Sequence, residues 1–130
     1  MFSKALTYIA AGCCAFALIA PVHARDTDLG TIPMASLPTE AQSTLTLIKQ
    51  GGPFPYAKDG VVFGNYERQL PLQRRGYYHE YTVPTPGSRS RGARRIIVGG
   101  APSKSATPTN SADYFYTGDH YASFQRIKQN

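Results

Sequence analysis

The sequence predicts an α+β fold in which one N-terminal helix packs on a small antiparallel β-sheet of about five strands. Two observations support this prediction. One stretch near the start of the domain has apolar residues at helical spacing, and the short runs after it are rich in aromatic and β-branched residues. A single helix followed by several strands is typical of proteins whose helix covers one face of an antiparallel sheet.

The first 24 residues have the organisation of a secretory signal peptide. Lys4 precedes an apolar run over 5–20, and Val22-His23-Ala24 offers the small residues of a cleavage site. The run is shorter than the roughly 20 residues of a membrane span, so we expect no membrane segment in the mature form. The expected destination is the extracellular medium or the periplasm. Residues 25–35 are expected to form a loosely docked lead-in, and 36–130 the domain.

Composition limits what the mature chain can do. Removing 24 of the 130 residues leaves 106, enough for one modest core. Both cysteines, Cys13 and Cys14, lie in the removed part, and two histidines remain, so a structural zinc site has almost no ligands. We expect no metal, no cofactor and a monomer. Loss of Lys4 lowers the net charge from +6 to +5, and a basic secreted protein favours polyanionic partners.

The helix is expected to begin around Pro38, which is tolerated in a first turn, and to end at Gly51. Its apolar positions are Leu37, Ala41, Leu45 and Ile48. The expected strands cover residues 61–63, 77–83, 95–98, 113–116 and 121–127. Residues 99–111 have the composition of a loop.

The central strand, 77–83, places one carboxylate in the middle of the sheet. Because strand residues alternate in direction, Glu80 shares a face with Tyr78 and Thr82, whereas Tyr77, His79, Tyr81 and Val83 share the other. Four arginines follow it closely, at positions 89, 91, 94 and 95, and His120 lies in a turn near the C-terminus. We expect Glu80, the arginines and His120 to converge on one phosphodiester of RNA.

These residue types suit RNA cleavage by the 2′-hydroxyl without a metal. Glu80 can act as the general base and His120 as the general acid. Arg91 and Arg95 present fixed, permanently charged forks that match phosphate oxygens. In the second step the roles reverse, because His120 activates water and Glu80 returns a proton.

Each of these residues also has a structural interpretation. Glu80 could be an ordinary residue on an exposed strand face, and His120 a solvent-facing turn residue. The arginines could form a phosphate patch without catalysis. His79 is better interpreted as a hydrogen-bonded core histidine than as a second acid, and Asp119 as a turn-forming residue. The functional interpretation rests on their occurrence together.

From residue 37 to 127 the sequence closely resembles the secreted bacterial guanyl-specific ribonucleases of the barnase superfamily, in the small streptomycete-type branch. The matching motifs occur in the family's order. They lie at 59–63, 65–67, 76–83, 85–87, 91–97 and 116–121.

The resemblance implies a role for each matching position. Glu80 corresponds to the general base, His120 to the general acid, and Arg91 and Arg95 to the phosphate-binding arginines. The implied guanine site comprises Phe63, Gly64, Asn65, Tyr66, Glu67 and Tyr121. In it one carboxylate accepts hydrogen bonds from guanine, two aromatic rings flank the base, and backbone N–H groups of the loop bind its O6.

Two positions depart from the family pattern. The family usually has Arg where this chain has Tyr66, and often a polar residue where it has Gly64. Backbone recognition of guanine tolerates both changes, whereas the missing positive charge beside Glu67 is expected to weaken guanine preference.

The sequence thus predicts a secreted, metal-independent endoribonuclease that cleaves single-stranded RNA 3′ to guanosine through a 2′,3′-cyclic phosphate. A non-catalytic RNA- or polyanion-binding protein is the alternative from another class. A third interpretation keeps the chemistry but makes the protein an interbacterial toxin. The resemblance also implies a small acidic, barstar-like protein inhibitor as a partner.

Overall fold

The computed structural model describes residues 29–100 and 112–129, which form one α-helix packed on a six-stranded sheet. The predicted signal peptide and most of the predicted 99–111 loop lie outside the described residues. The helix α1 spans Thr39–Gln50, after a short 3-10 helix at Met34–Ser36. The strands are β1 (Gly30–Pro33), β2 (Val61–Phe63), β3 (Tyr78–Thr82), β4 (Arg95–Gly99), β5 (Asp113–Thr117) and β6 (Gln125–Lys128).

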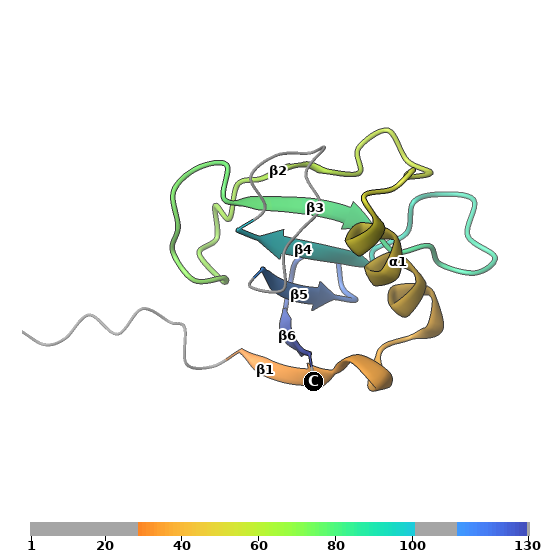
Figure 1. The fold of residues 1–130 in the computed structure, drawn as a ribbon, viewed down its shortest axis with the longest axis horizontal. Coiled ribbons are helices and arrows are strands. Elements are labelled where there is room, and N and C mark those ends of the chain that lie inside the picture. The colour runs from red at the N-terminus through yellow and green to blue at the C-terminus, as the bar shows by residue number, and fades with distance from the viewer. Residues whose placement is uncertain (1–28, 101–111, 130) are drawn as a thin grey trace, which may run out of the picture.

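The strands lie in the order β1-β6-β5-β4-β3-β2, and α1 crosses one face of the sheet against β3 and β4 (Figure 1). All neighbouring pairs are antiparallel except β1 and β6, which run parallel. The predicted α+β class with an N-terminal helix is therefore confirmed. The sheet has six strands and is mixed, whereas we expected about five antiparallel strands.

The helix forms where the apolar spacing predicts it. Pro38 precedes its first turn, and Gly51 ends it with a φ of 82°, a left-handed conformation that glycine adopts without steric cost. Three of its apolar side chains, Ala41, Leu45 and Ile48, are at most 1% exposed. They pack on the face of the sheet that carries Tyr81, Val83, Ile96, Val98, Tyr114 and Tyr116.

The opposite face of the sheet has a smaller aromatic core, which covers only part of that face. Tyr78, Ile97 and Phe115 pack there with Leu70 and Phe124. The same face also carries polar side chains, because residues paired across two strands point to the same side of the sheet. Glu80 is paired with Ile97, and Thr82 is paired with Arg95. The predicted alternation along the central strand is correct from Tyr78 onward. Tyr77 lies outside β3 and packs with this second core, not with the helix.

Both ends of the chain differ from the expectation. Within the expected loose lead-in, Gly30–Pro33 forms the edge strand β1, which pairs with β6 from Gly30↔Gln125 to Pro33↔Lys128. With only the four residues Gly-Thr-Ile-Pro, this strand is too short to show apolar alternation, and its pairing with β6 stabilises it. The last strand begins at Gln125 and not at residue 121, since Tyr121 has a φ of 70° and cannot continue an extended strand.

Candidate active site

Glu80 is the acidic centre of the polar face. Its side chain is 13% exposed, and its Oε1 lies 3.6 Å from Nη2 of Arg91. Oε2 accepts a hydrogen bond of 2.7 Å from the hydroxyl of Tyr121. The carboxylate is therefore held between a guanidinium and a phenol, on a rigid central strand.

Two of the four clustered arginines point to this centre. Nε and Nη2 of Arg91 both donate to Oγ1 of Thr82, at 3.0 and 2.8 Å. Arg95 is only 2% exposed, and its Nη1 donates to the carbonyl oxygens of Gly92 and Arg94. Apart from the 3.6 Å contact between Arg91 and Glu80, the acceptors that fix these two guanidinium groups are neutral and do not offset their positive charge.

The turn after β5 presents His120 and Tyr121. Asp119 accepts hydrogen bonds from the Thr117 hydroxyl and from the backbone and side chain of Ser123. These bonds, the Ser123 hydroxyl first, hold the pKa of the Asp119 carboxyl below its usual value. The next two residues, His120 and Tyr121, then adopt positive φ angles of 53° and 70°. Asp119 is a turn-forming residue, as predicted.

Tyr121 joins the separate parts of the site. Its ring centroid lies 4.9 Å from that of His120, and the Arg95 guanidinium carbon is 5.9 Å from the ring centroid. Burial, followed by the hydrogen bond to Glu80, raises the pKa of its hydroxyl to about 12. The hydroxyl therefore stays protonated at neutral pH and remains a donor. The structure brings Glu80, Arg91, Arg95 and His120 around this one phenol, which the sequence analysis assigned only to guanine.

A pocket of about 160 Å³ lies beside this cluster. Its lining residues are Phe63, Asn65, Tyr66, Glu67, Gln69, Tyr121 and Phe124. The loop after β2 forms its wall and is fixed internally, because the Asn65 side chain makes two hydrogen bonds to the backbone of Leu70. Five of the six predicted guanine-site residues line this pocket.

The sixth, Gly64, has a separate role. A Cβ atom at this position would lie 2.4 Å from Cε2 of Tyr66, so the tyrosine ring rests directly against the glycine. The two departures from the family pattern are therefore coupled in space, since a larger residue 64 would displace the ring.

The two aromatic residues expected to flank the base contact each other instead. The Phe63 and Tyr121 ring centroids are 5.3 Å apart with an angle of 24° between the planes. A base held between two rings needs about 7 Å, which is two contact distances of about 3.5 Å. In this conformation a base can stack on the outside of the pair, but it cannot enter between the rings.

The sequence analysis did not assign three further residues to the site. Gln69 donates to the Glu67 carboxylate and to the Tyr121 carbonyl oxygen, at 3.3 and 2.8 Å, and so links the pocket wall to the turn. Phe124 forms part of the pocket, and Thr82 anchors Arg91. No local pattern marks them, because their roles depend on contacts between distant segments.

His79 lies on the opposite face of β3 from Glu80, as predicted, and is 6% exposed. Burial lowers the pKa of its imidazole. Its Nδ1 has no hydrogen-bond partner among residues 29–100 and 112–129, so the expected hydrogen bond is not found at that atom. Across the same residues, no cluster of three or more potential metal ligands occurs, and no helix is long and apolar enough to span a membrane.

A mixed sheet that displays a carboxylate, two arginines and a histidine beside an aromatic pocket is the arrangement of a nuclease. The family model for ribonucleases matches residues 21–128, and the chain belongs to this family. Its relatives are the microbial guanyl-specific ribonucleases. Guanyl-specific ribonuclease Sa of Kitasatospora aureofaciens is 55% identical over 100 residues, covering 77% of this chain and 95% of the relative. Guanyl-specific ribonuclease St of Saccharopolyspora erythraea is 50% identical over 94 residues, covering 72% and 83%.

The solved structures that match this chain also include ribonucleases. A crystal structure of ribonuclease Sa2 with guanosine-2′-cyclophosphate matches with a TM-score of 0.68 and 44% identity, covering 78% of this chain and 98% of that chain. A structure of ribonuclease Sa2 in complexes with mononucleotides matches with a TM-score of 0.70 and 45% identity, covering 80% and 98%. The predicted family is thereby confirmed.

Proposed function

We propose that this protein cleaves single-stranded RNA on the 3′ side of guanosine, first by transesterification to a 2′,3′-cyclic phosphate and then by hydrolysis to the 3′-phosphate. The observation that supports this most directly is the arrangement around Tyr121, which contacts Glu80 and packs beside His120. A base and an acid on either side of one small site suit an in-line displacement at phosphorus.

In the first step Glu80 removes the proton of the 2′-hydroxyl, whose oxygen attacks phosphorus. His120 donates a proton to the departing 5′-oxygen, so that the bond between phosphorus and the next nucleotide breaks. In the second step water replaces the leaving group, His120 accepts its proton, and Glu80 protonates the 2′-oxygen. Arg91 and Arg95 stabilise the charge that grows on the phosphoryl oxygens in both steps. These side chains supply the base, the acid and the cations, so the mechanism has no step that needs a metal.

The pocket beside the cluster supplies base recognition. Glu67 is exposed toward it, and Gln69 holds one of its oxygens. Guanine presents two adjacent donors, its N1–H and its exocyclic amine, so one carboxylate can accept both, whereas adenine lacks the N1 proton. A bidentate contact of this kind discriminates between bases by about 1–3 kcal/mol. Phe63 adds stacking, which strengthens binding of any base.

Cleavage of a mixed-sequence RNA in excess chelator tests this function. The mature protein should release fragments ending in guanosine 2′,3′-cyclic phosphate, and Glu80→Gln and His120→Ala should each lower the rate by about 10²–10⁴-fold. Cleavage after every base would keep the mechanism and refute guanine selectivity. Binding of RNA by the folded protein without any cleavage would refute the enzyme and support a non-catalytic binding protein.

We also propose that the protein is exported and acts as a monomer. The support is the predicted signal peptide, and sequencing of protein recovered from culture medium should show Arg25 at the N-terminus. Recovery of a chain that begins at Met1 would refute export with cleavage. Gel filtration should show one copy of the chain.

A small acidic inhibitor is the partner that the family resemblance suggests. The partly exposed guanidinium of Arg91 and the basic net charge of the chain would suit an acidic surface. A neighbouring gene for a small acidic protein that abolishes cleavage when mixed at equal concentration would support this, and a toxin role with it. If no such protein inhibits the enzyme, a digestive role is favoured.

A further inference from the structure

The loop between β2 and β3 carries positive charge well beyond the pocket. Its first residues form the pocket wall, and it then continues through three exposed arginines, Arg68, Arg74 and Arg75. Over residues 64–76 the loop has one carboxylate, Glu67, against these three. In the part of the chain that the structure describes, no ion pair joins any of the three arginines to an acidic residue.

The loop holds these arginines in place. The Arg68 N–H donates to the Asn65 carbonyl oxygen at 3.0 Å, and the Pro71 carbonyl oxygen accepts a hydrogen bond of 2.6 Å from the Tyr78 hydroxyl. The Tyr77 N–H donates to the carbonyl oxygen of Arg74 at 3.1 Å, which closes the turn into β3. The backbone on both sides of the arginines is therefore tied to the sheet.

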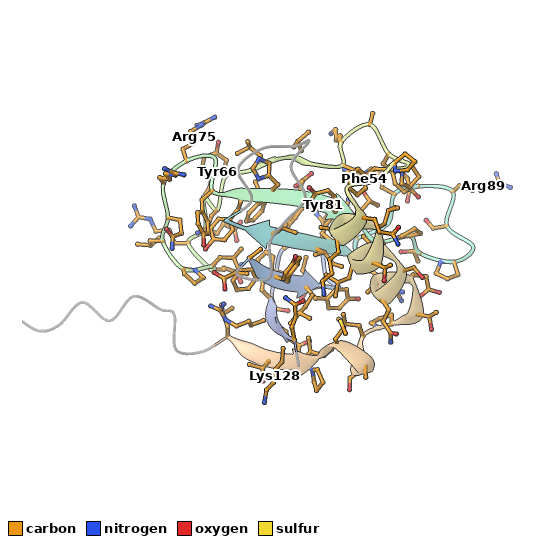
Figure 2. The ribbon with its side chains drawn as sticks, viewed as in Figure 1. Phe54, Tyr66, Arg75, Tyr81, Arg89 and Lys128 are labelled. Carbon is orange, nitrogen blue, oxygen red and sulfur yellow. The ribbon has the colours of Figure 1, made fainter. Side chains whose placement is uncertain are left out.

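The arginines lie at the opposite end of the site from the phosphate-binding groups. Along β3, Thr82 anchors Arg91 at one end, Glu80 is in the middle, and Tyr78 pairs with Phe63 of the pocket at the other end. At about 3.3 Å per residue, the four steps from Tyr78 to Thr82 cover roughly 13 Å. Arg75 lies just before Tyr78 in the chain, and Figure 2 shows it near Tyr66 at the end of the molecule opposite Arg89.

An aromatic ring accompanies these charges. Tyr66 lines the edge of the pocket, precedes the arginines in the chain and is 80% exposed, while its ring rests against Gly64. Cations for phosphates and an open ring face for a base are the two features by which proteins bind single-stranded nucleic acid.

We propose that this loop surface, consisting of Tyr66, Arg68, Arg74 and Arg75, binds the RNA strand on the 5′ side of the cleaved guanosine. The inference rests on the proposed function. The strand on the 3′ side leaves from the scissile phosphate at Arg91 and Arg95, away from this loop. The 5′ side leaves from the guanosine in the pocket and can reach the loop. The arginines bind its phosphates, and the outer face of Tyr66 stacks with the preceding base.

Three substrates test the proposal: the dinucleotide GpU, the 5′-extended UUUUGpU and the 3′-extended GpUUUUU. The test variant is Arg68→Gln/Arg74→Gln/Arg75→Gln. The matched control, Lys49→Gln/Lys58→Gln/Lys128→Gln, removes the same charge from other parts of the surface. Values of kcat/KM are measured at low salt, and thermal melting confirms that both variants fold.

For the arginine variant, kcat/KM on the 5′-extended substrate should fall about 10- to 30-fold, because each phosphate contact adds to the salt-dependent affinity. Its kcat/KM on the other two substrates should stay within about twofold of wild type, and the control should stay within about threefold on all three. An equal loss in test and control, a larger loss on the 3′-extended substrate, or no loss would each overturn the proposal.

A binding measurement separates this proposal from the proposed function. Oligonucleotides with 2′-deoxyguanosine at the cleavage site lack the attacking hydroxyl, so their dissociation constants need no catalysis. The arginine variant should bind the 5′-extended form about 10- to 30-fold more weakly than wild type. If wild type cleaves nothing, the proposed function fails while this comparison still supports or overturns the loop surface.

Discussion

Thr82→Val isolates the anchor of Arg91, one of the two arginines that we propose bind phosphate. The Thr82 hydroxyl accepts two hydrogen bonds from Arg91, at 3.0 and 2.8 Å, and the residue is 2% exposed. Valine keeps the β-branched shape and the backbone but offers no acceptor. The Thr82 N–H can still donate to Asp59 at 2.7 Å. The substitution should therefore release the guanidinium without disturbing the strand.

The expected loss of kcat/KM follows from how far the Arg91 and Thr82 side chains are exposed to water. Hydrogen bonds to a charged group contribute about 1.5–3 kcal/mol when buried. The Arg91 side chain is 25% exposed, so water replaces part of what is lost. We take about 1.4 kcal/mol for the loss of positioning, which corresponds to about a tenfold fall in kcat/KM.

Inhibition by two ligands distinguishes lost positioning from general damage. Guanosine 3′-monophosphate should bind several-fold more weakly to Thr82→Val, whereas guanosine, which has no phosphate, should bind as it does to wild type. Thr82→Ser keeps the hydroxyl and should restore most of the activity. Full activity in Thr82→Val, or an equal loss of affinity for both ligands, would refute the proposed link between Thr82 and phosphate binding.

Three further predictions concern other parts of the structure. Asp59→Ala should lower the free energy of unfolding by about 3–5 kcal/mol in urea titrations, because the buried carboxylate accepts two backbone N–H groups, and a loss below 1 kcal/mol would contradict this. Gly64→Ala should raise KM about fivefold by displacing Tyr66, and should have no further effect in a Tyr66→Ala background. Burial lowers the pKa of His79 from 6.5, so below about pH 6.5 the unfolded chain binds a proton that the folded chain does not. Stability should therefore fall on acidification, and His79→Gln should reduce that fall in melting experiments at pH 7.5 and 5.5.

Local patterns were sufficient for most elements of the fold. Helical spacing identifies α1, and the glycine after it sets its end, because both signals act within a few residues. Alternation along the central strand correctly separates Glu80 from His79. Strand β1 cannot be predicted from local patterns, because it pairs with β6 at the far end of the chain. The left-handed turn at Tyr121 likewise depends on Asp119 and the groups it binds, so the last strand starts later than its composition indicates.

The sequence by itself determined the α+β class and the family of this protein, and it predicted which residues act as the base, the acid and the two phosphate-binding arginines. These follow from residue types and from motifs that are short and contiguous. Only the tertiary structure decided how they meet. It placed Tyr121 against Glu80 as well as in the pocket, made Thr82 the support of Arg91, and set Tyr66 on Gly64. Each of these contacts depends on ångström-scale distances between side chains, and such distances are fixed only when the whole sheet has formed.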